Sequence, residues 1–376
     1  MNSRTIKEGL YIGLMSGTSM DGVDVVISEI RRLSLSVIGS ITVPYKKKLR
    51  RTLDRVVLNN EPLTIHSYAV LDVEIGKEFA EAVNYALQEF GIKNNHIIAV
   101  GSHGQTLRHS PSSAPPYSLQ IGDGATIAAL TNITCISNFR SLDIAKGGQG
   151  APLVPAFHEW CFSSEDKERS ILNIGGIANL TILNSDNTHP LGFDTGPGNC
   201  LMDEWTKLHL GKPYDKGGTW ASSGKTIPLL LESLLDYDYF KKDIPKSTGR
   251  EEFNLRFLRE KITSTSMSSA SSEDIQATLL DLSTYSITAT LDTFTKQKAS
   301  DVFVCGGGFY NTALIGALRK AMPARNFFST EKIGYDPRFV EATAFSWLAF
   351  MRISRLPVKL VTSKRMRRLQ LGAIHS

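Results

Sequence analysis

The sequence predicts a duplicated α/β fold, in which two mixed domains each begin with a β-hairpin and enclose a cleft between them. The stretch YIGLMSGTSMDGVDVVI, residues 11–27, has two apolar runs on either side of a small, polar, acid-containing turn. The stretch SILNIGGIANLTIL, residues 170–183, repeats this strand–glycine turn–strand pattern. Each hairpin is followed by segments with mixed strand and helix periodicity. Self-similarity of this kind indicates internal duplication.

In the first half, apolar segments rich in β-branched residues predict strands at 10–17, 22–30, 35–45, 96–106 and 133–139. The first three follow one another directly, so we expect an antiparallel meander. Residues 63–90 carry apolar side chains at helical spacing and end at Gly91, a typical C-cap.

In the second half, the hairpin is followed by a predicted helix at 274–297 and a strand, glycine turn and helix at 301–320. An apolar helix in the segment 336–353 follows a proline-containing entry, and we expect it to cross back to the first domain. We place the boundary near residues 139–150. The expected domains are 1–138 plus about 357–376, and 139–356.

The composition fits a globular cytoplasmic protein. A chain of 376 residues suits two domains, and no run of 18 apolar residues predicts a membrane span. The N-terminus lacks the pattern of a signal peptide. Four cysteines lie far apart without a CxxC pair, which fits a reducing compartment. The net charge of +5 includes two basic runs, 46–51 and 363–368. Solvated surfaces explain such runs more often than nucleic-acid binding does.

The turn of the first hairpin suits an anion. Backbone N–H groups of a glycine-containing turn converge on phosphate, and Thr18 and Ser19 add hydroxyl donors. Asp21 and Asp24 could hold Mg²⁺ beside a polyphosphate. The turn does not fit the P-loop pattern, and a plain hairpin with a polar tip is the alternative.

Two further glycine motifs suit a nucleotide. Gly175 and Gly176 form the tip of the second hairpin, and the run Gly306 to Gly308 lies between a strand and a helix. Glycines let the backbone lie flat against a base or ribose, and a helix N-terminus can face a phosphate. Glycine turns before helices are common, so the last motif alone is a weak signal. Together, the two hairpins suggest a phosphate clamp.

Asp194 is the candidate for chemistry. In GFDTGPGN, residues 192–199, it ends an apolar strand and could serve as a general base in a cleft. The alternative is an aspartate that caps a turn. Polar residues in 101–109 and 138–155, among them His103, Gln105 and Arg140, suit a hydroxylated ligand that carries a carboxylate. Glu341, an acid on an apolar helix, is either a salt-bridge member or a ligand contact.

Ordered motifs along nearly the whole chain resemble the anhydro-N-acetylmuramic acid kinase family: GLMSGTSMDGVD, SHGQT, FRSLDIAKGGQGAPLVPAFH, NIGGIANLT, GFDTGPGNCLMDEW, PKSTGREEF, VCGGGFYN and EATAFSWLA. The resemblance implies two RNase H-like domains of the actin-like ATPase superfamily, which flank an ATP and sugar cleft. It also implies a cytoplasmic enzyme of cell-wall recycling that opens 1,6-anhydro-N-acetylmuramic acid with water and phosphorylates O6 with ATP. A homodimer is expected, without nucleic acid or membrane as partners.

The resemblance also assigns residues. Asp194 would activate the attacking water, and Asp21 would contact Mg²⁺. The residues expected to bind ATP are Gly17, Thr18, Ser19, Met20, Asp21, Gly22, Val23, Asp24, Gly175, Gly176, Gly306, Gly307 and Gly308. The residues expected to line the sugar site are His103, Gln105, Arg140 and Glu341.

The chain departs from the family at three places. It has Asn138 where the family usually has Asp, and Gly124 is a substitution in the loop IGDGATIA, which otherwise keeps the family's form. It also has Thr362-Ser363-Lys364 with a basic run where the family tends to have Thr-Gly-Ala. Two other classes remain open. A non-enzymatic or chaperone-like ATP-binding protein would share the superfamily, but the chain has no separate peptide-binding domain. A sugar-binding module would leave the two phosphate hairpins unexplained.

Overall fold

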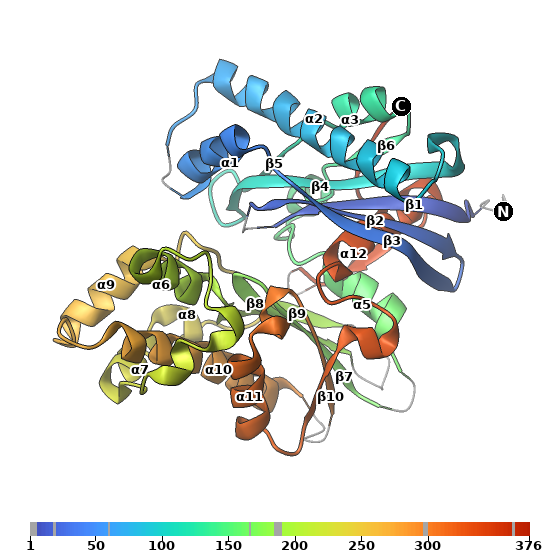
Figure 1. The fold of residues 1–376 in the computed structure, drawn as a ribbon. Coiled ribbons are helices and arrows are strands. Elements are labelled where there is room, and N and C mark those ends of the chain that lie inside the picture. Colours follow the sequence, from blue (N-terminus) through green and yellow to red (C-terminus); the bar gives the residue numbers. More distant parts are fainter. Residues whose placement is uncertain are drawn as a thin grey trace. The chain divides into compact units, whose positions relative to one another are not determined.

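The computed structural model describes residues 6–17, 20–58, 61–164, 167–183, 190–295, 300–362 and 365–376. The chain forms two compact units (Figure 1). Unit 1 comprises Met1–Cys161 and Phe339–Ser376, and unit 2 comprises Phe162–Arg338. Each unit is built on its own β-sheet with helices packed against it, so the predicted mixed α/β class is confirmed.

Unit 1 begins with the predicted meander. Its strands are β1 (Gly9–Ser16), β2 (Gly22–Arg31), β3 (Ser34–Pro44), β4 (Ile97–Ser110), β5 (Tyr117–Ile121), β6 (Cys135–Ser137), β12 (Val358–Leu360), β13 (Arg367–Leu369) and β14 (Ala373–His375). Its helices are α1 (Lys47–Leu53), α2 (Ile65–Glu89), α3 (Gly124–Thr131), α4 (Ser141–Ala145), α5 (Val154–Phe162) and α12 (Val340–Ile353). Helix α2 has Thr64 as its N-cap and is followed by Gly91 at φ +64°, close to the predicted bounds.

Within the described residues, the main sheet of unit 1 has the order β14-β6-β4-β1-β2-β3, with β5 paired to β4. Strands β1, β2 and β3 are antiparallel, whereas β4 runs parallel to β1 and β6 parallel to β4. The two faces of β1 alternate as strand geometry requires. Ile12 lies in the core cluster that includes Phe79 of α2, and Tyr11 packs edge-on against Phe350 of α12 at 5.7 Å.

Helix α12 approaches the sheet unusually closely. A Cβ atom on Gly13 of β1 would lie 1.8 Å from the carbonyl oxygen of Ala342, and one on Gly101 of β4 would lie 2.1 Å from that of Phe345. Only glycine permits such an approach of two backbones. The two glycines therefore allow the last helix to pack directly on the first sheet, in addition to the burial of its side chains.

Unit 2 repeats the pattern. Its strands are β7 (Arg169–Ile174), β8 (Ile177–Leu183), β9 (Leu191–Pro197), β10 (Asp301–Cys305) and β11 (Asn326–Ser329). Its helices are α6 (Cys200–Leu210), α7 (Pro228–Leu235), α8 (Asp238–Lys241), α9 (Leu255–Ser264), α10 (Ser272–Phe294) and α11 (Thr312–Ala321). Helix α10 packs against β9 and β8 and is central to the apolar core of the unit. Its bounds lie close to the predicted 274–297.

The sheet of unit 2 has the order β11-β10-β7-β8-β9 among the residues described. Strands β7, β8 and β9 are antiparallel, and β10 and β11 continue parallel to β7. Strand for strand, this is the order and direction of β6-β4-β1-β2-β3 in unit 1. The duplication read from the two hairpins therefore extends to the whole sheet, in the RNase H-like arrangement.

The division into units differs from the expected boundaries at residues 138/139 and 356/357. Helix α12 packs on β1, β4 and β2, as expected of a last helix that crosses back to the first domain, although the expected bounds placed it in the second. Helix α4 contacts β5, so it too belongs to unit 1. Helix α12 is assigned to unit 1 because ten of its residues are buried there. Burial on a sheet is a tertiary property that the local pattern at residues 139–150 does not carry.

Two residues of the first basic run are paired with neighbouring acids. Lys46 pairs with Glu78 and Glu81 of α2 at 2.8 and 2.7 Å, and Arg50 of α1 pairs with Asp21. Among the helices of the described part, none is long and apolar enough to cross a bilayer.

Candidate active site

The loop of the first hairpin, residues 17–21, is anchored by a side chain that it buries in the core of unit 1. Thr18 and Ser19 lie outside the described residues. The side chain of Met20 is 1% exposed in the core of unit 1, and its backbone adopts φ +53°. Val23 is equally buried. For these two residues the predicted nucleotide contact can come only from the backbone, because both side chains belong to the core.

Gln105 contacts this hairpin. Its Oε1 atom lies 2.7 Å from the hydroxyl of Ser16, and its Nε2 donates to the carbonyl of Gly17 at 3.4 Å. The Ser16 hydroxyl also donates to the carbonyl of Gly22 at 2.8 Å, across the base of the loop. Gln105 is 2% exposed. Its contacts are those of a residue that supports the loop, whereas the sequence predicts a sugar contact.

The two acids of the loop lie beside different partners. Asp21 has a side chain 59% exposed and is paired with Arg50. Asp24 lies on β2, where its Oδ1 accepts a hydrogen bond from the Thr42 hydroxyl at 2.6 Å. The described residues contain no group of three or more His, Cys, Asp or Glu side chains that could hold a metal by themselves. Asp21 therefore suits the kind of Mg²⁺ site that uses one carboxylate with phosphate oxygens and water.

The second hairpin is held by its backbone. The carbonyls of Gly175 and Gly176 accept N–H groups from the turn after β9: Asn199 donates to Gly175 at 2.9 Å, and Gly198 and Cys200 donate to Gly176 at 2.9 and 3.0 Å. The Asn199 side-chain amide donates to Gly175 as well, at 3.0 Å. The GFDTGPGN segment thus braces the NIGG turn directly.

Two of the three glycines after β10, Gly306 and Gly308, pack against the same hairpin. Gly306 adopts φ +80°, and its N–H donates to the Pro337 carbonyl at 2.8 Å. A Cβ on Gly308 would lie 2.3 Å from the Ile174 side chain, whereas one on Gly307 would meet no described atom within 4 Å. The packing of the unit thus explains Gly308, but it leaves room at Gly307.

The N-terminus of α11 is capped by the chain itself. The side chain of Asn311 accepts the N–H of Leu314 at 3.2 Å, and the Thr312 hydroxyl donates to the carbonyl of Gly217 at 3.0 Å. The prediction that this helix offers its N-terminus to phosphate is therefore weakened, because part of that end is already in use.

Asp194 is half-buried on β9 and is fixed at three points. Its Oδ2 accepts the N–H of Thr248 at 3.0 Å, its own N–H donates to the carbonyl of Lys246 at 3.0 Å, and its carbonyl accepts the Tyr239 hydroxyl at 2.7 Å. These partners come from the segment 239–248, distant in the chain. A carboxylate held in this way has a defined orientation, as a general base requires.

Further residues hold the hydrogen-bond partners of Asp194 in place. Glu252 accepts hydrogen bonds from the Thr248 hydroxyl at 2.5 Å and the Tyr237 hydroxyl at 3.2 Å. Lys246 lies over the Tyr239 ring at 4.6 Å, and burial lowers the pKa of its ammonium group. Burial, followed by the charges of Asp194 and Glu252, raises the pKa of Tyr239, so its hydroxyl stays a donor. The PKSTGREEF motif had no predicted role. Tertiary packing, which the sequence pattern does not reveal, places it against Asp194.

In unit 1, His103 and Arg140 form one hydrogen-bonded group. Burial, and secondarily the Arg140 charge, lowers the pKa of His103 well below its ordinary value. The neutral ring can donate from Nδ1 to the Gly104 carbonyl at 2.9 Å, which leaves Nε2 as the acceptor for Arg140 at 2.9 Å. Arg140 also donates to the carbonyl of Gly150 at 2.7 Å.

Glu341 lies in the first turn of α12 and is half-buried. A carboxylate at this end of a helix is favoured by the helix dipole. One turn later, Phe345 stacks on the His103 ring at 4.9 Å and on Phe139 at 5.5 Å. Residues four apart share a helix face, so Glu341 stands on the face of α12 that covers the His103–Arg140 group.

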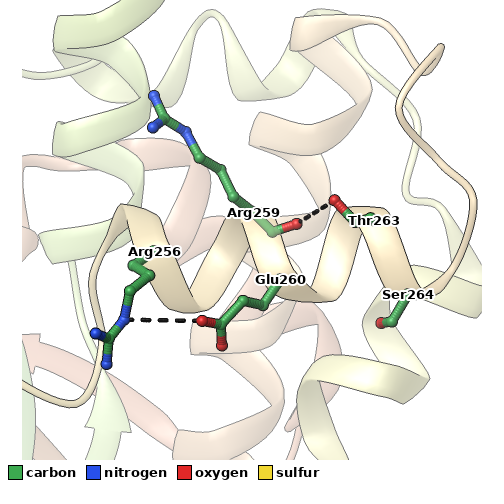
Figure 2. A pocket seen from close by; sticks show the side chains of 5 residues that line it. All are labelled: Arg256, Arg259, Glu260, Thr263 and Ser264. Atoms are coloured by element: carbon green, nitrogen blue, oxygen red, sulfur yellow. Dashed lines mark hydrogen bonds and ion pairs between the residues drawn. The ribbon is translucent and has the colours of Figure 1, made fainter.

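The predicted residues are divided between the two units. In unit 1, Gln105 contacts the first loop, and His103 contacts Arg140 and Phe345 of α12. In unit 2, the turn after the strand of Asp194 binds the Gly175–Gly176 turn. A shallow hollow elsewhere on unit 2 contains none of them. Figure 2 shows that it is lined by α9 alone, through Arg256, Arg259, Glu260, Thr263 and Ser264. Arg256 faces Glu260 at 3.7 Å, and Thr263 bonds back to its own helix, as on an ordinary solvated surface.

Comparison with known proteins agrees with the family resemblance that the sequence motifs predict. The family model described as anhydro-N-acetylmuramic acid kinase matches residues 9–376. A relative of that name from Shewanella halifaxensis is 45% identical over 97% of this chain and 98% of its own length. Another of the same name, from Shewanella pealeana, is 47% identical over 93% of this chain and 94% of its own. A solved structure of the activator of the 2-hydroxyisocaproyl-CoA dehydratase from Clostridium difficile covers 92% of this chain and 96% of its own, with a TM-score of 0.46 at 12% identity.

The repeated sheet, with a glycine-containing hairpin in each copy and an anchored aspartate beside the second, defines a duplicated RNase H-like α/β protein. The family match makes it a phosphotransferase. The chain belongs to the anhydro-N-acetylmuramic acid kinase family.

Proposed function

We propose that this chain uses ATP and water to convert 1,6-anhydro-N-acetylmuramic acid into N-acetylmuramic acid 6-phosphate and ADP, in the recycling of peptidoglycan. The observation that carries the proposal is the family match over residues 9–376. The geometry around Asp194 supports it, because hydrogen bonds hold both the backbone and the side chain of this residue.

In this proposal Asp194 is the general base. It takes a proton from a water molecule as the water oxygen bonds to the anomeric carbon of the sugar. The bond between that carbon and O6 breaks, and O6 forms its new bond to the γ-phosphorus as ADP leaves. Asp194 then returns the proton to solvent. The Thr248 N–H holds Oδ2 at 3.0 Å, so the carboxylate is oriented before the reaction begins.

The glycine motifs would serve the nucleotide. The loop 17–24, the Gly175–Gly176 turn and Gly307 offer backbone groups with little side-chain bulk, as polyphosphate binding requires. Asp21 would hold Mg²⁺, since its carboxylate is 59% exposed at the hairpin tip. The ion, when bound, neutralises charge on the transferred phosphoryl group. Arg50, the present partner of Asp21, would have to exchange with the ion or share the carboxylate.

The test is mass spectrometry of the sugar after incubation with 1,6-anhydro-N-acetylmuramic acid, Mg-ATP and ¹⁸O-labelled water. We expect a 6-phosphate with the label on the anomeric oxygen. An unlabelled phosphorylated product would remove water, and with it the general-base role, from the mechanism. ADP formed at the same rate without sugar would indicate a chaperone-like ATPase instead, and no ADP with this sugar would refute the assigned substrate.

A further inference from the structure

One buried carboxylate of unit 1 has no part in the reaction described above. Asp143, in α4, is 0% exposed. A buried carboxylate is costly unless hydrogen bonds and charges compensate for its lost hydration. Its Oδ2 accepts the N–H of Gly150 at 2.8 Å and the hydroxyl of Thr362 at 2.6 Å, and its Oδ1 lies 3.9 Å from Arg367 Nη1. Two of these three partners come from the C-terminal segment.

Asp143 also organises the glycine loop that follows α4. The N–H of Gly148 donates to the Asp143 carbonyl at 2.8 Å, and a Cβ on Gly148 would lie 2.1 Å from the carboxylate. Arg367 donates to the carbonyl of Gly147 at 3.0 Å. The loop is therefore held at Gly147, Gly148 and Gly150 by Asp143 and Arg367 together.

The peptide groups of Gly150 connect this cluster to the predicted sugar site. The Gly150 N–H is bound by Asp143, and its carbonyl accepts Arg140 Nη1 at 2.7 Å. Gly150 adopts φ +69°, and a Cβ there would lie 2.8 Å from Ile144, so the residue has little freedom to move. Arg140 is held on its other side by the neutral His103. Gly150 and His103 both hold the guanidinium, and the position of Gly150 depends on Asp143.

We propose that Asp143, held by Thr362 and Arg367 of the C-terminal segment, is a positioning residue that fixes Arg140 for the carboxylate of the sugar. This inference rests on the proposed function, because it takes the carboxylate-bearing sugar as the ligand of Arg140. It gives a role to the C-terminal basic run, in which Arg367 lies on β13 and faces Leu360 of β12. Ser363 and Lys364 lie outside the described residues.

The test compares four variants of the full chain. Thr362→Val removes the hydroxyl that donates to Asp143 at nearly constant volume, and Arg367→Met removes the guanidinium. Arg368→Met is the matched control, since Arg368 is the next residue on β13 and is exposed. We expect the first two variants to raise the KM for the sugar about tenfold, the equivalent of about 1.4 kcal/mol, with kcat and the KM for ATP unchanged. Arg368→Met should leave all three constants unchanged, and Thr362→Ser should restore the sugar KM.

A merely structural role predicts a different result, in which both KM values stay constant and the active fraction falls. That result, or an unchanged sugar KM in Thr362→Val and Arg367→Met, would overturn the proposal. Hydrogen–deuterium exchange without ligand gives a second reading: exchange at residues 147–150 should rise in Thr362→Val but not in Arg368→Met. If the wild-type chain forms no ADP with the sugar, the proposed function fails. The exchange result would still show whether the C-terminal segment orders this loop, and no change there would refute the linkage itself.

Discussion

The two hairpins have the same place in two equivalent sheets, yet they are stabilised differently. In the hairpin of unit 1, residues 17–21 join the strands, and the loop is anchored by the buried Met20 and by Ser16 and Gln105. In the hairpin of unit 2, only Gly175 and Gly176 join the strands, and their carbonyls are bound by backbone N–H groups of the turn after β9. Side chains predominate in the first loop, although the Met20 N–H also donates to the Gly17 carbonyl at 3.2 Å. Backbone hydrogen bonds predominate in the second, and the Asn199 side chain adds one more.

This difference indicates a division of labour. Side-chain anchors leave the tip of the first loop able to carry an exposed acid, Asp21, that suits a metal. A backbone-fixed turn offers no side chain of its own, but it is joined rigidly to the strand that carries Asp194. We therefore expect changes at Asp194 to affect the chemical step and changes at the glycine loops to affect binding.

The largest effect should come from Asp194→Asn. The amide oxygen can still accept the Thr248 N–H, so the fold and ligand binding should be retained. Loss of a general base lowers turnover by about 10²- to 10⁴-fold, and we expect a fall of that size in kcat with little change in either KM. Steady-state kinetics would measure it. Asp238→Asn, at an exposed carboxylate on α8, is the control. A kcat near the wild-type value would exclude Asp194 from the chemistry.

Sequence patterns predicted the parts of this comparison that depend on short-range order. The hairpins, the meander and α2 follow from periodicity and turn residues that lie within a few positions of one another. The supports of the site do not, because they join distant segments: Thr248 and Asp194 are 54 positions apart, and Thr362 and Asp143 are 219 apart. Gln105 shows the limit well. Its strand was predicted, but only tertiary packing turns its side chain toward Ser16.

A smaller effect should follow from alanine at the two glycines that have room for a side chain. A Cβ on Gly307 or on Gly17 would meet no described atom within 4 Å, so neither substitution should disturb its unit. If the nucleotide touches these backbones, Gly307→Ala and Gly17→Ala should each raise the KM for ATP by about fivefold, or about 1 kcal/mol, without changing the KM for the sugar. Gly316→Ala in α11, which also has space, should change neither constant. Unchanged ATP kinetics in both variants would argue against a nucleotide at these glycines.

The stability of the two units should respond differently when the pH is lowered. Burial lowers the pKa of His103 well below 6.5, that of His109 to about 4 and that of His158 to about 3, all in unit 1. The unfolded chain then binds more protons than the folded one, so the stability of unit 1 is complete above about pH 6.5 and falls toward pH 4. Each histidine contributes up to about 1.4 kcal/mol per pH unit.

Unit 2 should respond differently over the same range. Among its described residues, His209 is exposed, and burial raises the pKa of Glu204, which acts in the opposite direction. Urea unfolding at pH 7 and pH 5, followed by pulsed proteolysis with mass spectrometry, would assign the midpoint of each unit. We expect the midpoint of unit 1 to fall and that of unit 2 to change little. An equal fall in both units would contradict the assignment to these histidines.

The smallest effect should come from Asn138→Asp, where unit 1 depends on backbone conformation. Asn138 is exposed and adopts φ +54°, a left-handed conformation that Asn and Asp tolerate better than other side chains. Reversion to the usual family residue should therefore change the sugar KM by less than twofold and stability by less than about 0.5 kcal/mol. Asn138→Ala should cost about 1 kcal/mol in the free energy of unfolding, and Asn138→Gly should not. Denaturant titration and sugar kinetics on the three variants would separate an effect of the backbone conformation from an effect of the lost charge. A large gain in sugar affinity in Asn138→Asp alone would mean that the lost charge, and not the backbone, matters at this position.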